Sequence, residues 1–95
     1  MQVHVRSVGL IKMLLGAAER DVAVPEGTTV AGLLHQLRQE YGEKFSPYSM
    51  EPDAASAHAP LRVLVNGRDI AALGGTQTVL GEGDDVLMFV PIAGG

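Results

Sequence analysis

Residues 84–92 read DDVLMFVPI, and this stretch decides the fold. Apolar side chains occupy both faces of the extended chain, with Val86, Met88 and Val90 on one face and Leu87 and Phe89 on the other. A strand that is apolar on both faces is typical of the middle of a sheet, because both of its faces are covered there. Pro91 has no amide hydrogen and ends strand pairing. We therefore predict a central strand that stops just before the chain end.

Three earlier segments carry the period-two pattern of half-buried strands, namely residues 2–8, 19–24 and 61–65. Asn66-Gly67 follows the third and predicts a tight hairpin, because both residues tolerate positive φ. A short strand then precedes the glycine-rich turns. Residues 9–17, GLIKMLLGA, are apolar without a clean period and fit either a short helix or an apolar loop.

Residues 28–41 form the clearest predicted helix. One apolar stripe follows the helical repeat, made by Val30, Leu33, Leu34, Leu37 and Tyr41. Thr28 or Thr29 can accept a hydrogen bond as N-cap, and Gly42 suits a left-handed residue at the C-terminus. Residues 43–60 predict a long surface loop with at most one helical turn.

The order of these elements is strand, strand, helix, strand, short strand, central strand. It predicts an α+β protein with a β-grasp (ubiquitin-like) fold: a mixed sheet of four to five strands packed on one main helix. The first and last strands are then neighbours in the centre of the sheet. We predict a single domain over residues 1–95, from which residues 91–95 project as a flexible Gly-Gly tail.

The composition excludes several classes of function. The net charge is −4, and the seven basic residues are spread along the chain, which argues against a nucleic-acid partner. The absence of cysteine excludes disulfides, thiolate metal sites and a cysteine nucleophile, and it fits a reducing compartment. No apolar run approaches the length of a membrane span, and Lys12 interrupts the segment that resembles a signal-peptide core. We expect a cytoplasmic protein without a membrane partner.

Catalytic and metal-binding motifs are absent from the sequence. His4, His35 and His58 share no ligand spacing, so we expect surface histidines and no metal site. Asp84 and Asp85 are expected to be solvated turn residues. No phosphate loop or nucleophile elbow is present. We therefore predict that the domain catalyses no reaction by itself.

The last residues, Ile92-Ala93-Gly94-Gly95, offer a different chemistry. Two residues without side chains can pass through a channel that any Cβ would block. The tail ends in an unhindered carboxylate that a partner enzyme could activate with ATP. In this interpretation the tail is the substrate, and the folded domain is the part that the partner enzyme binds.

These features resemble the ubiquitin-like sulfur-carrier proteins, the MoaD/ThiS family, which includes the small subunit of molybdopterin synthase and the thiamine-biosynthesis sulfur carrier. The resemblance covers the whole chain. It rests on the first strand and on PEGTTVAGLLHQL (25–37), VLVNGRDI (63–70) and GEGDDVLMFVPIAGG (81–95). The ending is its most specific part: a Gly-Asp turn, an apolar strand, a proline and a terminal Gly-Gly.

The resemblance implies that a ubiquitin-activating-type adenylyltransferase adenylates Gly95 and that a sulfur donor converts it to a thiocarboxylate. Gly94 and Ala93 would thread through the enzyme, and the sulfur would pass to a synthase in cofactor, amino-acid or tRNA thiolation biosynthesis. The chain itself would bind no cofactor, because the partner uses the ATP. Docking candidates lie near the tail, and most have core packing as an equal alternative: Leu64, Leu87, Phe89, Pro91 and Ile92.

Two departures from the family pattern bear on the acceptor. Val90-Pro91 stands where many members have Pro-Pro, so the subfamily stays open. The tail also lacks the arginines that precede Gly-Gly in ubiquitin, which favours sulfur delivery over conjugation. The alternatives are a protein modifier joined through Gly95 to lysines, a subunit of a molybdopterin-synthase-like complex, and a β-grasp interaction domain with inert terminal glycines.

Overall fold

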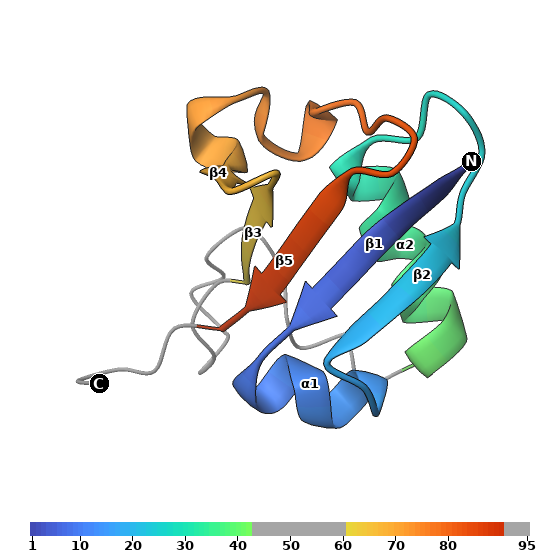
Figure 1. The fold of residues 1–95 in the computed structure, drawn as a ribbon, viewed down its shortest axis with the longest axis vertical. Helices are drawn as coiled ribbons and strands as arrows, with labels where there is room; N and C mark the ends of the chain where they lie inside the picture. Colours follow the sequence, from blue (N-terminus) through green and yellow to red (C-terminus); the bar gives the residue numbers. More distant parts are fainter. Residues whose placement is uncertain (43–60, 91–95) are drawn as a thin grey trace.

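The computed structural model describes residues 1–42 and 61–90 (Figure 1). The predicted loop over residues 43–60 and the tail over residues 91–95 lie outside the described residues. The described elements follow the order β1 (Gln2–Ser7), α1 (Gly9–Leu15), β2 (Glu19–Ala23), α2 (Val30–Tyr41), β3 (Arg62–Val65), β4 (Arg68–Asp69), two 3₁₀ turns (Ile70–Ala72 and Gly75–Gln77) and β5 (Asp85–Phe89).

Five strands of the described chain form one mixed sheet in the order β2-β1-β5-β3-β4. β1 and β5 are parallel, whereas the other neighbouring pairs are antiparallel. This confirms the prediction that the last strand is central and lies beside the first. β5 ends at Phe89, so Val90 lies beyond the strand, although it still packs against the core. The topology is the predicted β-grasp, with α2 across one face of the sheet (Figure 1).

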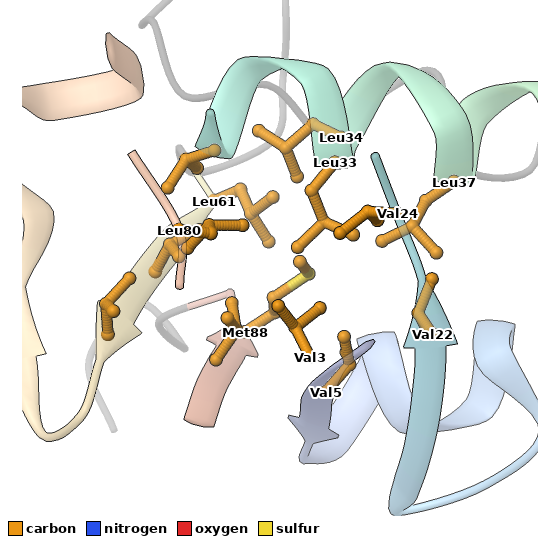
Figure 2. Packing of buried hydrophobic residues seen from close by; sticks show 14 of the residues in the cluster. Val3, Val5, Val22, Val24, Leu33, Leu34, Leu37, Leu61, Leu80 and Met88 are labelled. Carbon is orange, nitrogen blue, oxygen red and sulfur yellow. The ribbon is translucent and has the colours of Figure 1, made fainter. Parts of the chain in front are cut away.

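The core lies between the sheet and α2 and is aliphatic (Figure 2). Val30, Leu33, Leu34 and Leu37 of the predicted stripe are buried, and Tyr41 is partly buried. The sheet contributes alternate residues, as a period of two requires. These buried strand residues are Val3, Val5, Val22, Val63, Val65, Val86 and Met88.

Residues 9–17, for which two alternatives stood open, contain a true helix. α1 has only seven residues, and its N-cap residue, Val8, provides no side-chain hydrogen bond. Such a short helix is marginal on propensity alone. Ile11 and Leu15 point into the core at 0% and 8% exposure, so burial is what stabilises α1.

Turn and cap residues behave largely as predicted. Asn66 and Gly67 both have positive φ, at 52° and 82°, which the two-residue hairpin between β3 and β4 requires. Thr29 is the N-cap of α2, and its Oγ1 accepts a hydrogen bond from the Gly32 amide at 3.2 Å. The prediction for Gly42 was wrong in one respect. Its φ is 66°, but its ψ of −144° is extended, so it leaves the helix outside the left-handed helical region.

Candidate functional site

The sheet face opposite α2 is the candidate site. No helix in residues 1–42 or 61–90 lies across it, and the view in Figure 1 looks onto it. We call it the open face. Its side chains are the strand residues that alternate with the core residues, such as Asp85, Leu87 and Phe89 on β5.

Leu64, Leu87 and Phe89 form an apolar strip on this open face. All three are half-buried, and none belongs to the buried core. Leu64 and Leu87 lie directly opposite each other in the β3–β5 register, which places their side chains in contact range. The structure therefore places these three residues outside the buried core, and their role in docking stays a prediction.

Val8 extends the strip and was not among the predicted docking residues. Its backbone is extended, with φ −136° and ψ 161°, so it continues the outward alternation of His4 and Arg6. It directly follows Ser7, which pairs with Met88, the residue before Phe89. Its exposed fraction is 53%. The alternation of residues 2–8 contained this signal.

Ion pairs border the apolar strip on both sides. Arg6 donates two hydrogen bonds to Asp85, each 2.7 Å long, and these hold the pKa of the Asp85 carboxyl below its ordinary value. Arg62 pairs with Asp69 across β3 and β4. The Ala71 amide and Arg62 both lower the pKa of Asp69. These charges are paired with one another within the described residues, so the apolar strip lies between two closed ion pairs.

The expectation for the two aspartates before the last strand was half right. Asp84 is a turn residue, since its carboxylate accepts hydrogen bonds from the Gly81 amide at 2.7 Å and from Asn66 Nδ2 at 3.0 Å. Asp85 instead begins β5 and binds Arg6. A cross-strand partner 79 positions away leaves no local signal in the sequence.

His4 also lies on the open face, with Nδ1 2.8 Å from Asp21 Oδ1 and Nε2 3.0 Å from Glu19 Oε1. The two carboxylates lie against different ring nitrogens and so do not converge on one point. Across the described residues, no three His, Asp or Glu side chains come together in a way that could hold a metal ion. The helices described here are also too short or too polar to cross a membrane.

The end of β5 determines where the tail begins. Met88 pairs with Ser7 on one side and Val63 on the other, and Phe89 pairs with Arg62. The described part of β5 therefore ends in the middle of the sheet, beside the apolar strip. The proposed roles of Pro91, Ile92, Ala93, Gly94 and Gly95 fall outside the described residues and stay predictions.

Comparison with known proteins adds an independent line of argument. The model of the ThiS family matches residues 8–95. Small archaeal modifier protein 3 of Haloferax volcanii is 30% identical over 95 residues, and the match covers both chains completely.

Two solved structures share the fold over nearly the full length. The Haloferax volcanii HVO 2177 protein has a TM-score of 0.79 at 29% identity, covering 100% of this chain and 87% of that one. The putative molybdopterin converting factor, subunit 1, from Pyrococcus furiosus has a TM-score of 0.76 at 26% identity, covering 97% of this chain and 99% of that one. The similarity thus extends over the whole chain and not only over the sheet.

Proposed function

This chain belongs to the ThiS family, and from that premise we propose that it is a sulfur-carrier protein whose working group is the carboxylate of Gly95. The observation that carries the proposal is the family match, which runs through the terminal glycine. The described fold supports it, because its last strand, β5, is central in the sheet and ends beside the half-buried apolar strip.

The proposed chemistry takes place in a partner enzyme. A Gly95 carboxylate oxygen attacks the α-phosphorus of ATP, pyrophosphate leaves, and an acyl-adenylate forms. Hydrosulfide then attacks the acyl carbon, and the bond to AMP breaks with AMP as the leaving group. The product is a C-terminal thiocarboxylate, which passes its sulfur to an acceptor synthase. ATP and the sulfur donor are substrates of the partner, and this chain is a cosubstrate present in the cytoplasm.

The folded domain provides the surface that the activating enzyme binds during this reaction. We propose that the activating enzyme docks on the apolar strip of Leu64, Leu87 and Phe89, with Val8 beside it. The neighbouring ion pairs are closed within the molecule, so an apolar partner surface is the natural complement. Gly94 and Ala93 then enter the active-site channel, with Pro91 and Ile92 between them and the sheet.

A second candidate function is protein modification through Gly95. The full-length similarity to a small archaeal modifier protein favours it. In that case a lysine amine of a target protein attacks the acyl-adenylate or a derived thioester, and an isopeptide bond forms. Similarity to a putative molybdopterin converting factor subunit raises a third possibility, a subunit whose tail enters a synthase.

One experiment separates the sulfur carrier from the protein modifier. The protein with its native terminus is incubated with a candidate activating enzyme, ATP and sulfide, and its intact mass is recorded. Exchange of one oxygen for sulfur supports the carrier. Isopeptide-linked products with lysine-containing proteins support the modifier.

The matched control is the chain from which only Gly95 is deleted. It keeps every described residue and should give neither product. A thiocarboxylate on this control, or an unchanged mass of the native chain with every cognate activating enzyme supplied, contradicts the proposal.

A further inference from the structure

His4 occupies an unusual position between two carboxylates of the edge strand. It faces Asp21 across the β1–β2 register and reaches Glu19, the first residue of β2. Each ring nitrogen lies within hydrogen-bond distance of a carboxylate oxygen, at 2.8 and 3.0 Å. An ionised carboxylate can only accept a hydrogen bond, so both ring nitrogens must donate. Only the protonated imidazolium carries two N–H groups.

The other charged groups around His4 also favour its protonated form. Asp85 faces it from β5 in the parallel register, and Arg6 lies two positions along β1. Arg6 is engaged with Asp85, which leaves His4 as the cation that contacts Glu19 and Asp21. Loss of the His4 proton would place a ring lone pair against a carboxylate on one side.

β2 is fastened to the rest of the molecule from both faces. On the helix side, Arg20 binds Glu40 and Tyr41 at the end of α2. That pairing does not titrate near neutral pH, because arginine stays protonated. On the open side, His4 contacts the strand, and its charge does change in this range.

We propose that His4 is a proton-operated clip that fastens the edge strand β2 to β1. When protonated, it holds Glu19 and Asp21 over the open face. When deprotonated, it releases at least one of them and leaves β2 attached by its backbone hydrogen bonds and by Arg20. The inference concerns the sheet alone and does not depend on the proposed sulfur chemistry.

The direction of the pH effect follows from the hydrogen bonds. Asp21 first and Glu19 second raise the pKa of His4 above its ordinary value of 6.5. The clip is therefore closed below about that pH and opens as the pH rises through the folded-state value. Raising the pH from 6 to 9 should loosen β2 without unfolding the core.

Nuclear magnetic resonance tests the clip on the intact protein. Imidazole ¹⁵N signals should show both nitrogens of His4 protonated at pH 6, with a titration midpoint above 6.5. Backbone amides of Arg20 and Val22 face β1, as the flanking bonds Ser7 N–H to Ala18 O and Val24 N–H to Met1 O show. Their exchange protection, corrected for intrinsic rates, should fall about two- to fivefold as the clip opens.

The variant His4→Gln should abolish this pH-dependent fall, whereas His35→Gln should retain it, because His35 is exposed on α2. A His4 midpoint at or below 6.5, or an equal fall of protection in wild type and His4→Gln, overturns the proposal. The imidazole titration of the wild type needs no variant, so the test stands even where a substitution disturbs folding.

Discussion

On the sheet face that meets α2, Val63, Val86 and Met88 are completely buried, whereas one position along the same strands Leu64 and Leu87 stay half-exposed. Folding explains the first set, because removal of apolar surface from water is the main driving force. It does not explain the second, since no helix of the described residues covers the face on which these two leucines lie (Figure 1). This difference supports the proposal that a partner docks on the open face.

The largest effect on stability is expected from a substitution in the core between α2 and the sheet. Leu33 is fully buried at 0% exposure, so Leu33→Ala leaves a cavity between α2 and the sheet. We expect a loss of about 2–5 kcal/mol in the free energy of unfolding, measured by urea denaturation. A loss below about 1 kcal/mol would show that α2 is loosely packed and would break the contrast between the faces.

A substitution on the open face should cost little stability but weaken binding to a partner. Leu87→Ala removes a half-buried side chain from the strip, so we expect a loss of only about 1 kcal/mol in stability. The affinity of this variant for the proposed activating enzyme should fall about tenfold, because buried anchors dominate interfaces. Titration calorimetry or surface plasmon resonance measures the change.

The matched control for this variant is Leu73→Ala. Leu73 is an exposed leucine, at 39%, that lies after β4 and outside the strip. Its loss should leave the affinity unchanged. Equal weakening by both substitutions would mean that the strip is not the docking surface.

The smallest effect is expected at the border of the strip. Arg6→Gln removes the paired hydrogen bonds to Asp85 and leaves the strip itself intact. Exposed ion pairs contribute little, so the denaturation midpoint at pH 7 should fall less than in Leu33→Ala or Leu87→Ala.

The pH dependence of this change identifies its cause. Arg6 lowers the folded-state pKa of Asp85 below 3.8, so the stabilisation is present above that pH and is lost as the pH falls through the folded value. Wild type and Arg6→Gln should therefore converge in acid. A difference that persists unchanged below the folded pKa of Asp85 would assign the effect to packing of the arginine stem instead.

Much of the fold follows from local sequence. The stripe of α2, the Asn66-Gly67 turn and the two-sided apolar pattern of β5 each combine neighbouring residues into one structural signal. The sequence pattern does not decide whether residues 9–15 form a helix or a loop, because seven residues are too few to show a helical period. Burial of Ile11 and Leu15 decides it, and burial depends on the sheet.

The candidate site likewise has some features that the sequence predicts and others that only the structure shows. Leu64, Leu87 and Phe89 could be named from their positions in the strands, but whether they face the core or solvent depends on which side α2 covers. The pairs Arg6–Asp85 and His4–Asp21 join residues 79 and 17 positions apart. No local pattern predicts them, because they depend on the strand register.

The sequence by itself determined the strands and helix α2, their order, the central place of β5 and the terminal Gly-Gly, because each is encoded by neighbouring residues and by local backbone preference. Only the tertiary structure decided that residues 9–15 form a helix, which face of the sheet α2 covers, and that His4 lies between two carboxylates. Those properties arise from strands that are distant in the chain and become neighbours only when the sheet forms.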